Sequence, residues 1–137
     1  MTNETSLTFY VPAAAAEAGK RLLRIVETLV PGEKINIHRT IQGFTGRFRR
    51  PPEEPVIAVI FVSCREELGE IIAIRDLLRE IPLVLILPDN DKDTVAKAHS
   101  LRPRFLTYTD SDVREVSGVL SRMIEKLGKE SRYGKGR

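Results

Sequence analysis

The chain has 137 residues, 42% of them hydrophobic and 30% charged, which is the balance of one folded domain rather than of a disordered, fibrous or membrane-spanning chain. Its net charge is only +3, and basic residues near the C-terminus account for much of it, so we expect a nearly neutral body. The only cysteine, Cys64, excludes an internal disulfide and a multi-cysteine metal site, and two distant histidines, His38 and His99, give no metal-ligand spacing.

Residues 7–11 favour a short β-strand that Pro12 ends, and the segment after it predicts an amphipathic helix closed by Pro31-Gly32. The apolar residues on one face of that helix are Ala15, Ala18, Leu22, Ile25, Val26 and Leu29. The same stretch is not an export signal, because it lacks a basic start and Glu17 and Lys20 interrupt its alanines. We therefore expect a cytoplasmic protein.

Residues 34–39 alternate like a half-buried strand at the edge of a sheet. Thr40 is suited to cap a short helix after it. The apolar face of that helix consists of Ile41, Phe44 and Phe48.

Residues 56–62 form an unbroken apolar run rich in β-branched side chains, which is typical of a strand covered on both faces. The segment Ser63-Cys64-Arg65-Glu66 then has the spacing of a capping box and predicts the start of a helix. The apolar residues of this helix recur at helical period as far as Ile81: Ile71, Ile74, Leu78 and Ile81.

Residues 83–87 predict a second fully apolar strand, followed by a weakly amphipathic helix over residues 91–101. Residues 104–109 indicate a more polar strand, after which Asp110 or Asp112 is suited to cap the last helix. That helix carries a clear apolar stripe: Val113, Val116, Leu120, Met123, Ile124 and Leu127.

Strand and helix thus alternate through five units, which predicts a parallel sheet with helices on both faces and right-handed crossovers. Because the first, third and fourth strands are more apolar than the second and fifth, we expect the order 2-1-3-4-5 of the flavodoxin-like doubly wound fold. We assign residues 1–5 to an N-terminal extension, 6–128 to the α/β domain and 129–137 to a mobile basic tail.

Several local features agree with this fold. Pro55 stands six residues before Phe61 and Gly69 eight residues after it, Ile81-Pro82 leads into the fourth strand, and Arg104-Phe105-Leu106 begins the fifth. With this architecture and spacing, residues 6–127 resemble the receiver domain of bacterial response regulators. The resemblance implies a signalling domain of two-component systems, and it concerns the fold more than the function.

In receiver domains an acidic pair ends the first strand and binds magnesium, and an aspartate that accepts phosphate ends the third. Here those positions fall on Val11-Pro12 and on Phe61, or on Val62 if the register slips by one. The hydroxyl residue of the fourth strand falls on Leu87, and the lysine of the fifth falls on Tyr108, or on Thr109 in the alternative register. The chain therefore resembles a pseudo-receiver that is not phosphorylated, binds no metal or cofactor, and is not an enzyme.

Other sites have weaker signals. The segment Asp89-Asn90-Asp91-Lys92-Asp93 resembles the start of a calcium loop but lacks its glycine and final glutamate, so helix capping explains it better. Cys64 has no phosphate-binding loop or base beside it and is expected to be a small, semi-buried residue. The arginines of residues 47–50 are followed at once by Glu53-Glu54, so we do not expect nucleic-acid binding.

Two functional hypotheses remain from the sequence. The first is a signalling or scaffold module that binds a protein partner, or a second copy of itself, through the last two helices and the fifth strand, with Arg104, Tyr108 and Arg114 on that surface. The alternative is a small flavodoxin-like enzyme or ligand-binding domain at the carboxyl edge of the sheet. Its polar groups would be Cys64, Asp89 and Asp110.

Overall fold

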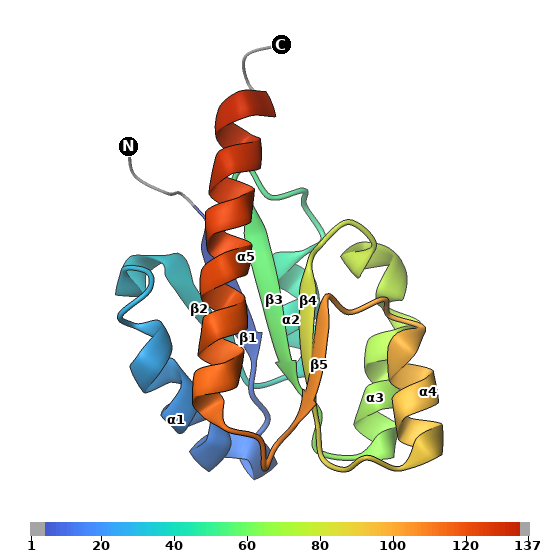
Figure 1. Ribbon diagram of the computed structural model, residues 1–137. Helices are drawn as coiled ribbons and strands as arrows, with labels where there is room; N and C mark the ends of the chain where they lie inside the picture. Colours follow the sequence, from blue (N-terminus) through green and yellow to red (C-terminus); the bar gives the residue numbers. More distant parts are fainter. Residues whose placement is uncertain (1–4, 135–137) are drawn as a thin grey trace.

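The computed structural model describes residues 5–134, with side chains from residue 5 to residue 128. Its centre is a five-stranded parallel sheet in the order β2-β1-β3-β4-β5 (Figure 1), which confirms the predicted flavodoxin-like topology. The strands are β1 (Ser6–Tyr10), β2 (Ile35–His38), β3 (Val56–Phe61), β4 (Leu83–Leu87) and β5 (Phe105–Tyr108).

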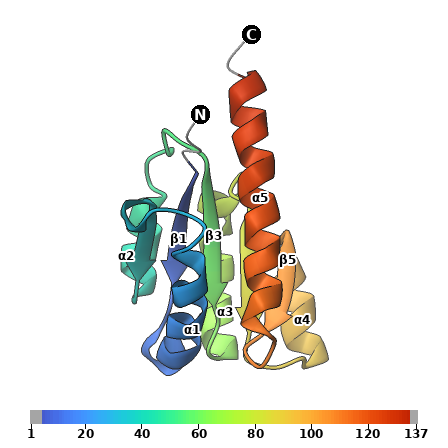
Figure 2. The ribbon, with the colours of Figure 1, turned by 60° about the vertical axis from the view of Figure 1, so that its left-hand side comes forward.

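Helices cover both faces of the sheet: α1 and α5 lie on one face, and α2, α3 and α4 on the other (Figures 1 and 2). The α-helices are α1 (Ala16–Val26), α2 (Ile41–Arg47), α3 (Arg65–Ala73), α4 (Lys92–His99) and α5 (Val113–Gly134). Within residues 5–134 there are also three short 3-10 helices: η1 (Ala13–Ala15), η2 (Gly32–Lys34) and η3 (Arg75–Leu78). Among the described residues, none of the helices combines the length and the apolar character that crossing a membrane requires.

The order of the strands follows their hydrophobicity. Every residue of β1, β3 and β4 is buried, because each of these strands has a neighbour on both sides and helices over both faces. The edge strands β2 and β5 are partly exposed, and Ile37 in β2 keeps 44% of its surface accessible. The half-buried edge strand expected at residues 34–39 is thereby confirmed.

Side chains that alternate along the strands build two separate cores. One core lies between the sheet and α1 with α5 and includes Leu22, Val59 and Leu120. The other lies under α2, α3 and α4, where Phe44 and Phe48 stack edge to face with ring centroids 5.1 Å apart. The apolar faces predicted for the short second helix and for the last helix are therefore the faces that the fold buries.

Three predicted helix ends are wrong. The first helix ends at Val26 rather than Leu29, because the N–H groups of Thr28 and Leu29 donate to carbonyls three residues earlier instead of four. The third α-helix ends at Ala73. The apolar residues predicted to continue it as far as Leu78 lie instead in and before the separate 3-10 helix η3. The last one continues to Gly134, past the expected start of the tail. The mobility expected of residues 129–137 stays a prediction; residues 135–137 and the side chains of 129–134 lie outside the described part.

The predicted capping box is shifted by one residue. Cys64, not Ser63, is the N-cap of α3, and its side chain makes no capping hydrogen bond. The acidic partner is Glu67 instead of Glu66: its Oε1 accepts from the backbone N–H of Ser63 at 2.7 Å and from the Ser63 hydroxyl at 3.0 Å. At α2 the predicted cap is confirmed, because Thr40 Oγ1 accepts from the Gly43 N–H at 3.0 Å.

Candidate functional site

The positions that the receiver resemblance assigns to phosphorylation chemistry lie at the carboxyl edge of this sheet and hold apolar side chains. Val11 is 2% exposed, Phe61 3%, Val62 2% and Leu87 0%, and we call these four residues the apolar edge cluster. Val11 and Phe61 belong to the core under α1 and α5, and Val62 and Leu87 to the opposite core. Pro12, also buried, follows Val11 and is the N-cap residue of η1. The cluster therefore leaves no carboxylate or hydroxyl at these positions.

Packing against Val11 is unusually close. A Cβ atom added to Gly19 of α1 would stand 2.6 Å from Val11 Cγ1, well inside the contact distance of two carbon atoms. Glycine at this position lets the helix approach the end of β1. The backbone of α1 thus helps to close the space around Val11.

Tyr108 and Thr109 occupy the two registers considered for the lysine of receiver domains. Tyr108 ends β5 and packs partly on the core under α4. The Thr109 hydroxyl donates to the Leu87 carbonyl at 3.1 Å. Neither residue supplies a cation to this edge of the sheet.

A polar cluster that the sequence reasoning missed joins the carboxyl ends of β1 and β3 to α3. The Tyr10 hydroxyl donates to Glu67 Oε2 at 2.8 Å, while Ser63 donates to Oε1 of the same carboxylate. Burial, followed by the hydrogen bond to Glu67 and the charge of Glu67, raises the pKa of Tyr10 well above its usual range. Three donors fix the Glu67 carboxylate, so this cluster fastens α3 to the sheet.

The polar groups of the alternative hypothesis, Cys64, Asp89 and Asp110, are all exposed. Cys64 is exposed, so the expectation of a semi-buried thiol is wrong; it is the N-cap residue of α3 and its side chain makes no capping hydrogen bond. Asp89 accepts from the Asp91 N–H at 2.9 Å, and the exposed Asp110 lies in the turn after β5. Asp89 and Asp110 do not cap a helix. Of the two candidates for the last helix it is Asp112 that caps α5, because its Oδ1 accepts from the Arg114 N–H at 2.8 Å.

The caps of the last two helices come from neighbouring aspartates. Asp91 accepts from the N–H groups of Asp93 and Thr94 at the start of α4 and pairs with Arg65 at 2.8 Å. Capping therefore accounts for the calcium-like segment. In the part of the chain that the structure describes, no three His, Cys, Asp or Glu side chains come together as metal ligands.

The predicted interaction residues lie around β5 but do not form one cluster. Arg104 precedes β5 at the amino edge of the sheet, and Tyr108 ends it at the carboxyl edge. Arg114 lies in the first turn of α5, where its Nη2 pairs with Asp112 Oδ2 at 2.9 Å. Hydrogen bonds from Arg114 lower the pKa of Asp112, whose carboxylate also accepts from the Arg114 N–H.

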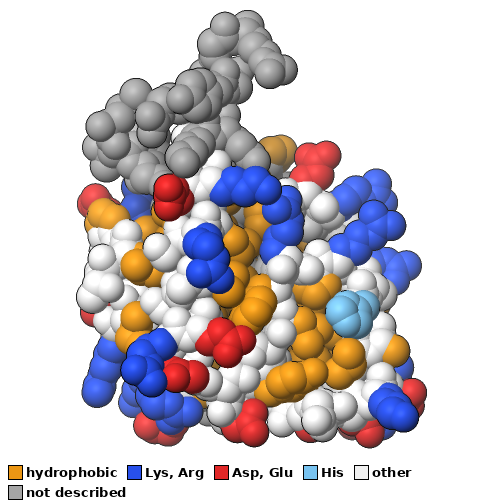
Figure 3. All heavy atoms as spheres, in the orientation of Figure 1, with side chains coloured by type: hydrophobic (Ala, Val, Ile, Leu, Met, Phe, Trp, Pro, Cys, Tyr) orange, Lys and Arg blue, Asp and Glu red, His pale blue; other side chains and the backbone are white. Residues whose placement is uncertain are grey.

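Between these residues lies a partly apolar surface. Figure 3 shows hydrophobic side chains gathered over β5 and the flanks of α4 and α5. The partly buried apolar residues of these elements are Val95, Phe105, Leu106, Tyr108, Val113, Met123 and Leu127. We call this surface of α4, β5 and α5 the partner face. Because β5 pairs only with β4, its outer edge is open.

Comparison with known proteins identifies the fold. No family model matches the sequence, and no curated protein matches it. A response regulator receiver domain protein from Methanospirillum hungatei JF-1 superposes with a TM-score of 0.69 at 9% identity, over 92% of this chain and 98% of that one.

Two similar structures come from proteins described in connection with pilus assembly. The one from Burkholderia pseudomallei K96243 has a TM-score of 0.63 and 16% identity, covering 93% of this chain and 95% of its own. The one from Burkholderia thailandensis E264 has a TM-score of 0.58 and 19% identity, covering 86% and 95%. At such identities the likeness establishes a shared receiver-like fold.

Proposed function

We propose that this chain is a non-catalytic, receiver-like signalling or scaffold module that accepts no phosphate and acts by binding another protein through the partner face. The observation that carries the proposal is the apolar edge cluster. Phosphoryl transfer to a protein needs a nucleophilic carboxylate, a divalent cation and groups that neutralise the equatorial oxygens. Val11, Phe61 and Leu87 supply none of these at the matching positions.

The filled edge also weighs against the alternative, an enzyme or ligand-binding domain at the same place. Such a domain needs a concave site with convergent polar groups. The carboxylates of Asp89 and Glu67 are instead bound to donors of their own chain. The proposed module therefore acts through its exposed surface and not through a site at the carboxyl edge of the sheet.

The partner face offers the combination that protein interfaces use: apolar contacts surrounded by charge. Leu106 and Tyr108 on β5 provide the apolar centre, and Arg104 and Arg114 stand at its two ends. The described link of two similar structures with pilus assembly favours a scaffold role in a larger assembly. A homodimer through the same face is the simplest form of this interaction, and a heterologous protein is the other.

The first test concerns phosphorylation. The protein is incubated with acetyl phosphate, or with a beryllium fluoride mixture, with and without magnesium, while intact mass and amide chemical shifts are followed. We expect no added phosphate and no magnesium-dependent shift. A covalent phosphate, or shifts clustered at residues 61–65, 87–91 and 108–112, would contradict the proposal.

The second test locates the interface. A photo-crosslinking amino acid replaces Tyr108 on the partner face. As the control, it replaces the exposed Arg21 of α1, a helix that is not part of the partner face. We expect cross-links to a second copy or to one defined protein from position 108 alone. Absence of any cross-link from position 108, together with a monomer in sedimentation analysis, would refute binding through this face.

A further inference from the structure

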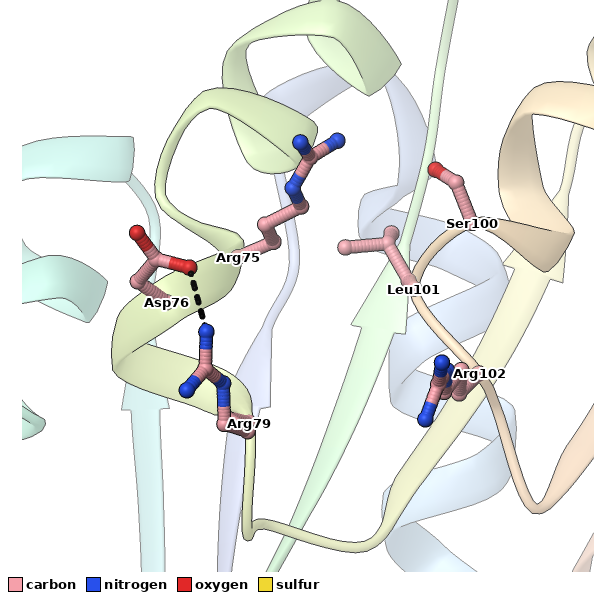
Figure 4. A pocket seen from close by; sticks show the side chains of 6 residues that line it. All are labelled: Arg75, Asp76, Arg79, Ser100, Leu101 and Arg102. Carbon is pink, nitrogen blue, oxygen red and sulfur yellow. Dashed lines mark hydrogen bonds and ion pairs between the residues drawn. The ribbon is translucent and has the colours of Figure 1, made fainter.

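A cleft at the amino edge of the sheet, at the end opposite the apolar edge cluster, has three arginines among its six lining residues. It has a volume of about 440 Å³ and lies between the residues of η3 and the segment after α4, which precede β4 and β5 respectively. Its lining residues are Arg75, Asp76, Arg79, Ser100, Leu101 and Arg102 (Figure 4), and we call it the arginine cleft. A volume of this size suits a small molecule.

The arginine cleft carries uncompensated positive charge. Its three guanidinium groups and the one carboxylate of Asp76 leave a formal charge of +2. Asp76 pairs with Arg79 at 3.3 Å, but both side chains are mostly exposed, so water weakens this pair. Within the described residues, Arg75 and Arg102 form no ion pair at all.

Arg102 has a backbone conformation that its residue type disfavours. Its φ of 53° is the only positive value among the described residues other than glycine. At the end of a helix, glycine adopts this left-handed conformation without the steric cost, on the order of 1 kcal/mol, that a side chain adds. Compensation of the α4 dipole could explain one cation there, but it explains neither the conformation nor Arg75 and Arg79 on the facing segment.

We propose that the arginine cleft binds a small solute through a phosphate or pyrophosphate group. A phosphate monoester carries a charge of about −1.5 to −2 at pH 7, which matches the +2 of the cleft better than a single carboxylate does. Guanidinium groups bind phosphate oxygens through paired, charge-assisted hydrogen bonds. The buried Leu101 adds an apolar wall for the rest of the ligand.

Charge distribution favours a small ligand over nucleic acid. Proteins that follow a nucleic-acid backbone need an extended basic track, whereas here the net charge of the whole chain is +3. Figure 3 shows basic side chains in several separate groups, one of them at the upper right, with acidic side chains between them. This face therefore carries no continuous basic track.

The test is a titration with inorganic pyrophosphate, followed by calorimetry and by amide chemical shifts at near-physiological salt. We expect saturable shifts confined to residues 75–79 and 99–103. Arg75→Gln and Arg102→Gly should each weaken binding roughly tenfold, the equivalent of one lost charge-assisted hydrogen bond. Asp76→Asn should strengthen binding, because it removes the competing carboxylate.

Stability controls separate binding from folding. Arg102→Gly should unfold at a temperature no lower than the parent protein, since glycine suits the left-handed backbone at this position. Arg21→Gln, an equal loss of charge on α1, should leave binding unchanged. The proposal is overturned by shifts spread over the whole basic surface, by equal weakening in Arg21→Gln, by absence of saturable binding, or by tighter arginine-dependent binding to single-stranded DNA than to pyrophosphate.

Discussion

Replacing Gly19 by alanine should destabilise the protein although it adds a better helix former. The new Cβ atom would stand 2.6 Å from Val11 Cγ1, about 1 Å inside an ordinary carbon contact. Val11 is 2% exposed and β-branched, so it cannot swing away. Overpacking of this kind costs about 2–3 kcal/mol, against a gain of about 1 kcal/mol from helix propensity. We expect a net loss of roughly 1–2 kcal/mol.

Gly69→Ala is the matched control. Gly69 lies within α3, and a Cβ atom added there would meet nothing within 4 Å. It should therefore stabilise the protein by about 0.5–1 kcal/mol. Equilibrium unfolding in urea measures both variants, and the difference between them isolates the contact with Val11. A further variant, Val11→Ala combined with Gly19→Ala, should be more stable than the sum of the single effects predicts. If Gly19→Ala is as stabilising as Gly69→Ala, the close packing is refuted.

Other predictions concern titration and exposure. Because the pKa of Tyr10 is raised in the folded protein, the free energy of unfolding should fall as pH rises above the ordinary tyrosine pKa of about 10. Glu67→Gln should lower the pKa of Tyr10 in a spectrophotometric titration, in which Tyr10→Phe assigns the signal. An unchanged pKa would contradict this prediction. Burial and, to a smaller extent, the charge of Arg47 lower the pKa of His38. The free energy of unfolding should therefore fall as pH drops below about 6.5. Acid unfolding should show a smaller loss in His38→Gln. The exposed Cys64 should react with iodoacetamide as fast in the folded protein as in urea, and protection in the folded state would contradict its placement.

The sequence predicts the sheet well because its strands differ sharply in hydrophobicity. The runs at residues 56–62 and 83–87 are apolar throughout and match β3 and β4 to within one residue. The alternation in Lys34–Arg39 marks an edge strand for the same reason: one face meets the core and the other meets water. Strand order follows from this ranking together with the handedness of the crossovers.

Helix ends and the arginine cleft are not predictable in the same way. Ile71, Ile74 and Leu78 fit an α-helix, yet a spacing of three residues also suits the 3-10 turn that follows Ala73. A left-handed residue at the end of a helix is usually predicted from a glycine in the sequence. Because Arg102 adopts this conformation without being glycine, the sequence alone does not predict it. Arg75 and Arg102 are far apart in the sequence and line the same cleft only because the fold places η3 and the segment after α4 on its two sides.

The two edge strands also set how the molecule opens. β2 and β5 have four residues each, are only partly buried and pair on one side, whereas β1, β3 and β4 are buried throughout. Hydrogen exchange should therefore be slowest in the three inner strands and fastest at the two margins, which fluctuate open without global unfolding. The partner face includes β5, and the arginine cleft is lined in part by the segment that leads into β5. Occupation of either site should slow exchange in β5 and leave β2, the opposite margin, as an internal reference.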